Sequence, residues 1–264
     1  MFVGVITSMF GIGEGVLLVP FLTLAVGIPI QIAIATSLVS TIANSSAASM
    51  AYIKDRRLNL RLALWFAITA TLGAIIGAEL AAQTDRTVLS EVFAAALVAT
   101  AVVVFLRRKD VDAGQSTGRR NAHYDRFQLD GSYTNGTTER IVTYQVRNPL
   151  LGLLSGFVAG NASGLLGIGG GLINVPVLTL GMRVPIKVAT GTSALIIGLT
   201  ASTGAIIYYA NGFVQPLLAA IVLEAVFMGA LIGPRLQGKV RNEALTAIFA
   251  VVLVILASLM VVKL

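Results

Sequence analysis

The chain alternates between long apolar stretches and short breaks that contain glycine, proline or charged residues. Most of the apolar stretches reach the roughly 20 residues that a helix needs to cross the hydrocarbon core of a bilayer. Because lipid offers the backbone no hydrogen-bonding partners, such segments have to be helical. The pattern therefore predicts an all-α polytopic membrane protein. The predicted spans are 2–27, 29–53, 59–82, 87–106, 150–180, 184–209, 213–236 and 244–262.

Composition agrees with this prediction and narrows the chemistry. Hydrophobic residues make up 56% of the chain and charged residues only 12%, whereas charged residues are about a quarter of a soluble protein. The chain has no cysteine, and its single histidine, His123, falls in a polar stretch. The sequence therefore offers neither a thiol nucleophile nor a metal site, and it indicates no cofactor. An enzyme is the less favoured class.

The net charge of +7 does not indicate nucleic acid. The Lys and Arg residues gather in short loops between apolar spans, which is the pattern of topology signals. The glycine-rich stretch at 167–171 is not followed by Lys-Ser or Lys-Thr, so it is not a phosphate-binding P-loop.

The two halves of the chain repeat each other at an offset of 156 residues. This predicts a first membrane repeat at 1–106, a linker at 107–148 and a second membrane repeat at 149–264, and internal duplication is typical of transporters. The landmarks that coincide are Gly11–Gly15 with Gly167–Gly171, Val19-Pro20 with Val175-Pro176, and Thr36-Ser37 with Thr192-Ser193.

Each repeat begins with a glycine-broken segment, followed by three spans. The pieces after the glycines, 16–26 and 172–182, would be about 16 Å long as helices, half the thickness of the hydrocarbon core. If they cross the membrane fully, the repeats are parallel; if they enter and turn back, the repeats are inverted. Inversion leaves only Arg86 and Lys263, of 19 Lys and Arg residues, outside the cell, so the positive-inside rule favours it.

The linker carries a predicted cytoplasmic β-hairpin. Residues 125–133 and 139–146 are rich in aromatic and β-branched residues, and Asn135-Gly136 between them is a strong hairpin signal. Because the linker is polar, we expect it to be a connector that adds nothing to the membrane core. A regulatory or partner contact is the alternative.

The glycine clusters are the first candidate for an anion site. A short helix that begins beside such a cluster presents free N–H groups and a positive dipole end to the membrane interior. Two equivalent ends can face one site near the midplane. The alternative is close helix packing through small residues. The candidate residues are Gly13, Gly15, Gly169, Gly170 and Gly171.

Polar residues within the spans are the second set of candidates. Hydroxyl and amide groups can donate hydrogen bonds to an anion that sheds its water, although Ser and Thr also bond to their own helix. The candidates for substrate binding are Thr36, Ser37, Asn44, Asn174, Thr192 and Ser193.

Two carboxylates within apolar spans are candidates for coupling or gating. Ionisable groups inside a membrane are costly and are functional hypotheses by default. Glu224 lies near the middle of one span, and Glu14 takes the place of a glycine in the first cluster. A carboxylate repels an anion unless it is protonated, which suggests coupling to protons. The alternative for Glu14 is a charge that stabilises the start of a helix.

These motifs resemble the sulfite exporter TauE/SafE family of membrane permeases over nearly the whole chain. The resemblance rests on Gly167–Gly171 with Pro176, on the degenerate copy at 11–15 with Pro20, and on the two Thr-Ser pairs. It implies a multi-pass transporter of small sulfur-containing anions, such as sulfite or organosulfonates, in the prokaryotic cell membrane. Glu14 departs from the family pattern, which has glycine there.

The expected partners are a small anion, the lipid bilayer, a coupling proton or sodium ion, and a second copy of the chain. A membrane scaffold or sensor subunit is the alternative to transport. The scaffold or sensor hypothesis does not explain why glycine clusters occur at duplicated positions within the membrane.

Overall fold

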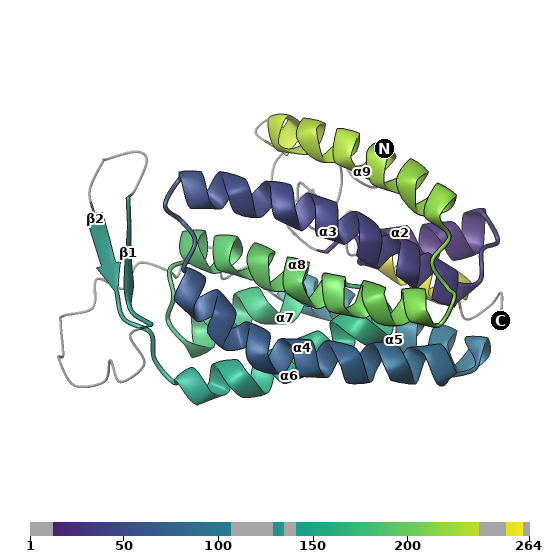
Figure 1. Cartoon of the computed structure of the whole chain (residues 1–264), viewed down its shortest axis with the longest axis horizontal. Coiled ribbons are helices and arrows are strands. Elements are labelled where there is room, and N and C mark those ends of the chain that lie inside the picture. Colours follow the sequence, from purple (N-terminus) through teal and green to yellow (C-terminus); the bar gives the residue numbers. More distant parts are fainter. Residues whose placement is uncertain (1–12, 107–128, 135–140, 238–251, 261–264) are drawn as a thin grey trace.

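The computed structural model describes residues 13–106, 129–134, 141–237 and 252–260. Its helices lie roughly along one long axis, and a two-stranded hairpin projects from one end of the bundle (Figure 1). Four described helices, α3, α4, α6 and α8, are long and apolar enough to cross a membrane, so the predicted multi-pass helical architecture is confirmed. The elements are α2 Gly15–Pro20, α3 Ile30–Lys54, α4 Leu60–Gln83, α5 Arg86–Leu106, β1 Gly131–Thr134, β2 Ile141–Tyr144, α6 Pro149–Leu166, α7 Gly171–Pro176, α8 Ile186–Ala210 and α9 Pro216–Gln237.

The short helices α2 and α7 each continue into a π-helical turn. These turns span Phe21–Ala25 and Val177–Gly181, directly after Pro20 and Pro176. Proline has no N–H to give to the α-helical ladder, so the hydrogen bonding changes at this point. The bounds of α2, the first π turn and α3 recur 156 residues later as α7, the second π turn and α8.

Helices α3 and α8, which occupy equivalent places in the two halves, run antiparallel. Glycines of α8 lie against α3 in reverse sequence order, so the start of α3 and the end of α8 share one end of the bundle. The contacts are Gly204 with Leu38, Gly198 with Ser45, and Gly191 with Tyr52.

The segment from α6 to the second π turn leads back to the end at which it begins. After α6, the chain reverses through Gly167–Gly170, and Gly170 lies beside the Ala159 carbonyl in the middle of α6. The second π turn then ends next to the start of α6, where the Arg147 N–H donates to the Met182 carbonyl over 3.1 Å.

A seam of glycines joins α6 to α4, which runs parallel to it. A methyl group added to Gly160 would lie 1.9 Å from the Ala70 carbonyl oxygen, and one on Gly164 would lie 2.2 Å from that of Ala74. Small residues four apart let membrane helices approach at backbone distance. This run of glycines, whose role was not predicted from the sequence, comprises Gly152, Gly156, Gly160 and Gly164.

The predicted β-hairpin is confirmed as a two-stranded antiparallel sheet, but its register differs from the expectation. Thr134 pairs with Ile141, which centres the hairpin between residues 137 and 138 rather than on Asn135-Gly136. Residues 135–140 themselves lie outside the described part of the chain.

The expectation that the linker adds nothing to the core is wrong for the residues around the hairpin. Leu129 is 5% exposed and packs in one cluster with Leu62, Phe66 and Met182. The Asn59 side chain, at the start of α4, donates to the Leu129 carbonyl and to the Tyr144 hydroxyl, both over 2.8 Å. Apolar residues beside the strands therefore anchor the hairpin to the bundle, although the linker as a whole is polar.

Loss of this anchor should be measurable. Burial raises the pKa of the Tyr144 phenol to about 12, opposed by the hydrogen bond from Asn59 and reinforced by Asp130, so the phenol stays neutral at physiological pH. Tyr144→Phe removes an acceptor and leaves the Asn59 amide with one partner fewer, which should cost about 1 kcal/mol. We expect a lower melting temperature of the purified protein, whereas Tyr133→Phe, on the other strand, should leave it unchanged. Equal melting temperatures for both variants would contradict the anchor.

Candidate functional site

The two glycine clusters meet in the interior of the bundle. A methyl group added to Gly13 would lie 1.8 Å from the Ile168 carbonyl oxygen, and one added to Gly15 would lie 1.9 Å from the carbonyl oxygen of Gly167. No side chain fits in such a space. Close packing therefore explains why residues 13 and 15 are glycines, which was the alternative to an anion site.

The second cluster needs glycine for a different reason. Gly167, Gly169 and Gly170 have φ angles of 68°, 78° and 68°, in the left-handed region that other residues adopt at a cost. These angles reverse the chain after α6 so that α7 can begin at Gly171. Gly169 also packs against Ile197 of α8 and Thr41 of α3.

The starts of α2 and α7 flank this contact. Neither helix has a side chain that caps its first turn. With their π turns, the helices run over Gly15–Ala25 and Gly171–Gly181, long enough for the N–H groups at each start to form a positive end. Two such ends therefore lie near one another in the interior of the bundle.

Glu14 is buried at this place, with 3% of its surface exposed. The Asn44 side-chain amide donates to its Oε1 atom, while the buried Oε2 atom has no hydrogen-bond partner among the described residues. The Ser40 hydroxyl lies beside the same carboxyl group. Since the Glu14 side chain makes no capping bond to α2, it is directed to the side chains of α3 instead.

Three of the four residues in the Thr-Ser pairs have structural partners. Thr36 donates to the Ile32 carbonyl of its own helix over 2.8 Å, and Ser37 donates to the Gly167 carbonyl over 3.2 Å. The Thr192 hydroxyl accepts from the Asn59 N–H over 3.1 Å. Ser193 is 1% exposed, and its hydroxyl has no partner among the described residues.

The two pairs do not lie together. Because α3 and α8 are antiparallel, Ser37 is near the level of Gly204 and Ser193 is near the level of Tyr52. These levels are separated by roughly 20 Å along α3. One small anion does not contact both pairs.

Six further buried side-chain polar atoms lack a partner in the described part of the chain, and two of them belong to residues next to the glycine clusters. These two are the side-chain oxygen of Asn174, on α7, and the hydroxyl of Thr41, on α3. Both residues are at least nine-tenths buried, at 1% and 3% exposure. Buried polar groups are normally hydrogen-bonded, so an unpartnered pair near the glycine clusters indicates room for a ligand or water. Asn174 was predicted from the sequence; Thr41 was not, because its counterpart in the second repeat is Ile197.

The structure does not bring Glu224 to these residues. Glu224 is exposed on α9, on the outside of the described bundle. Of the two predicted coupling carboxylates, only Glu14 lies at the glycine clusters.

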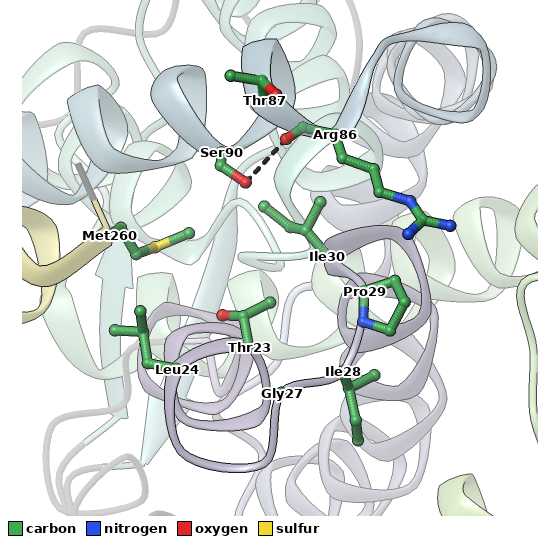
Figure 2. A pocket seen from close by; sticks show the side chains of 10 residues that line it. All are labelled: Thr23, Leu24, Gly27, Ile28, Pro29, Ile30, Arg86, Thr87, Ser90 and Met260. Atoms are coloured by element: carbon green, nitrogen blue, oxygen red, sulfur yellow. Dashed lines mark hydrogen bonds between the residues drawn. The ribbon is translucent and has the colours of Figure 1, made fainter. Parts of the chain in front are cut away.

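A pocket of about 260 Å³ opens at the end of the bundle opposite the hairpin. Figure 2 shows Thr23 and Leu24 of the first π turn on one side of it, and Arg86, Thr87 and Ser90 of α5 on the other. Its other lining residues are Gly27, Ile28, Pro29, Ile30 and Met260. The Ser90 hydroxyl donates to the Arg86 carbonyl over 2.8 Å, and Thr23 donates to its own helix. Among the described residues, the Thr87 hydroxyl and the Arg86 guanidinium are the side-chain donors of this pocket with no hydrogen bond shown.

Comparison with known proteins identifies the family. The family model for the sulfite exporter TauE/SafE matches residues 1–260. The chain belongs to the TauE/SafE family. The resemblance drawn from the glycine clusters, the prolines and the Thr-Ser pairs is therefore confirmed.

Curated relatives within the TauE/SafE family are described as probable membrane transporter proteins. YunE of Bacillus subtilis is 28% identical over 262 residues, which cover 96% of this chain and 91% of that protein. MJ0441 of Methanocaldococcus jannaschii is 24% identical over 95% of this chain and 88% of its own length. YdhB of Bacillus subtilis is 25% identical, with 93% and 91% covered. No solved structure matches the chain.

Family membership and the apolar helices together make the chain a multi-pass protein of the cell membrane in a family of transporters. The positively charged residues of the described part are consistent with such a placement. Arg86 lies at the pocket end. The hairpin end of the bundle carries more of them, in its loops and in the adjoining helix ends: Lys54, Arg56, Arg57, Arg61, Arg147, Arg183 and Lys187.

Proposed function

We propose that this chain transports small sulfur-containing anions, such as sulfite or organosulfonates, across the cell membrane. The observation that carries the proposal is the placement of the two uncapped helix starts, Gly15 and Gly171, on either side of the contact between the glycine clusters. Helix starts bind anions through N–H groups and need no positive side chain. The name of the family model, sulfite exporter, supports the class of anion.

The binding site we propose lies beside the contact between the two clusters, at the helix starts. The N–H groups around Gly169, Gly170 and Gly171 face the anion from one half of the chain, and α2 contributes from the other half. Asn174 and Thr41, whose side chains lack partners in the described residues, complete the polar lining. The close packing of Gly13 and Gly15 against the second cluster also holds the two halves together at this point.

We further propose that the halves are inverted repeats with re-entrant glycine-broken segments. Three observations support this topology. Helices α3 and α8 are antiparallel, and the second π turn returns to the start of α6. Positive charge is concentrated at the hairpin end of the bundle. In such folds, one half rocks against the other around a fixed midplane site, which opens to each side of the membrane in turn.

Glu14 is the group we propose for coupling. A carboxylate next to an anion site repels the anion, so protonation of Glu14, or a sodium ion bound to it, favours occupancy. The Asn44 amide holds one carboxyl oxygen and leaves the other available for the proton or the cation.

Flux through purified protein in liposomes tests the function. Radiolabelled sulfite and a short organosulfonate should move faster than in protein-free liposomes, with saturation at high concentration, and unlabelled anion should compete. Sulfate serves as the comparison anion. If no sulfur anion moves through correctly folded protein, transport of this substrate class is refuted, and the scaffold or sensor alternative gains support.

Equivalent positions test the topology. Asp55 and Asn211 are 156 residues apart and directly follow α3 and α8. The chain has no cysteine, so Asp55→Cys and Asn211→Cys can each be labelled singly. Inverted repeats predict that a membrane-impermeant maleimide added to intact cells reacts only with the cysteine at 211, and that permeabilisation exposes the one at 55. Labelling of both positions from the same side would refute inversion.

A further inference from the structure

The outer face of α9 carries a carboxylate among apolar side chains. Leu217, Ile221 and Met228 are 77%, 59% and 50% exposed, and Glu224 is exposed between them on the same face. Glu224 is eight residues from the start of α9 and so lies about 12 Å along the helix from that end. If α9 crosses the membrane as its equivalent α4 can, this depth falls within the hydrocarbon core. A carboxylate that faces lipid at such a depth is costly, which makes lipid an unfavourable neighbour.

Helix α4 is a comparison within the same molecule, because it occupies the equivalent place in the first half. Its positions Leu60, Leu64, Ile68 and Leu72 are 54%, 52%, 60% and 54% exposed, and all are large and apolar, as lipid requires. The equivalent positions of α9, each 156 residues later, are Pro216, Ala220, Glu224 and Met228, and these are also exposed. The outer face of α4 is therefore suited to contact with lipid, whereas the equivalent face of α9 carries a small residue and a carboxyl group.

Glu224 does not lie on the side of α9 that is equivalent to the α6-contacting side of α4. On α4, Ala70 and Ala74 contact the α6 glycines. Their equivalents on α9 are 226 and 230, and Val226 is 2% exposed. A helix that packed on α9 as α6 packs on α4 would therefore cover the Val226 side and leave Glu224 uncovered.

We propose that α9 is the interface between two copies of this chain, with the Glu224 carboxyl groups hydrogen-bonded to one another across a two-fold axis along the membrane normal. A two-fold axis brings each residue next to its own copy, so a group on the axis has to be complementary to itself. A carboxyl group can both donate and accept a hydrogen bond, so it can meet this condition.

The spacing and size of the neighbouring residues fit such a contact. Leu217, Ile221, Glu224 and Met228 follow one another at intervals of four, three and four residues, the seam along which helices pack at a shallow angle. Ala220 is small enough to let two backbones approach, and polar side chains join membrane helices through hydrogen bonds. The proposal is independent of the substrate and of the anion site.

Cross-linking in the cysteine-free chain tests the interface. Met228→Cys and Leu72→Cys occupy equivalent positions, with 50% and 54% of the native side chains exposed. Oxidation in native membranes should convert the Met228→Cys protein largely to a disulfide-linked dimer and leave the Leu72→Cys protein monomeric. Absence of dimer at 228, or equal dimer at 72, overturns the proposal.

Substitution of Glu224 tests the role of the carboxyl group. The self-association of labelled protein in liposomes is followed by single-molecule photobleaching as the protein is diluted in lipid. Glu224→Gln keeps a self-complementary side chain and should preserve the dimer. Glu224→Ile, the residue that α4 has at this position, should weaken association roughly 5- to 30-fold while the monomer stays folded. Wild-type protein that is monomeric, or an unchanged dimer for Glu224→Ile, overturns the proposal.

Discussion

Replacing Gly13 with alanine should force the two glycine clusters apart and abolish transport. The added methyl group would lie 1.8 Å from the Ile168 carbonyl oxygen, far closer than atoms can approach, and its neighbour is backbone that cannot rotate away. Overpacking of this kind costs about 1–3 kcal/mol or more. We expect a clearly lower melting temperature and no sulfite flux in liposomes.

Gly27→Ala is the matched control for Gly13→Ala. Gly27 has a φ angle of 77°, but nothing lies within 4 Å of an added methyl group. Its substitution strains the backbone by about 1–2 kcal/mol without a clash, so flux should persist. If Gly13→Ala transports as well as Gly27→Ala, the clusters are not in the close contact that the structure shows.

Glu14→Gln should remove the dependence of transport on a proton gradient while retaining anion binding. The amide has nearly the shape of the carboxyl group and can still pair with Asn44, but it cannot ionise. We expect flux without a gradient to persist and its stimulation by an opposed pH gradient to disappear. The measurement is the initial rate of sulfite flux in liposomes with and without the gradient.

Two variants make this test specific. Glu79→Gln changes a carboxylate at the end of α4, where it accepts from Gln83, and should leave the stimulation intact. Glu14→Gly gives the first cluster the residue that Gly170 supplies in the second, and it should behave as Glu14→Gln does. A gradient response that survives in both Glu14 variants would assign coupling to another group.

The sequence predicted the helices well because their limits are set locally. Glycine, proline and charged residues interrupt the apolar stretches, and the expected spans 29–53, 59–82 and 184–209 differ from α3, α4 and α8 by one or two residues at each end. The hairpin was predicted from aromatic and β-branched residues. Its docking was not, because the contacts of Leu129 and Asn59 join segments far apart in the chain.

The candidate site was predicted less completely because its residues depend on how the helices pack. The sequence paired Thr36-Ser37 with Thr192-Ser193 by equivalence, but antiparallel helices place equivalent residues at different depths. Likewise, the sequence does not distinguish a glycine that packs against a carbonyl, such as Gly13, from one that reverses the chain, such as Gly170. Only the contact partners and the φ angles separate the two roles.

The difference between Glu14 and Gly170 has a consequence for the transport cycle. In a carrier made of two identical inverted halves, the inward-open and outward-open states have equal free energy, and each is populated half of the time. If this chain works by the proposed alternation of inverted halves, a buried carboxyl group in one half alone removes this equality, and we expect the empty carrier to rest with one side open. The resting side sets how quickly anions are captured from each compartment, whereas the ion gradients alone set where the anion finally accumulates.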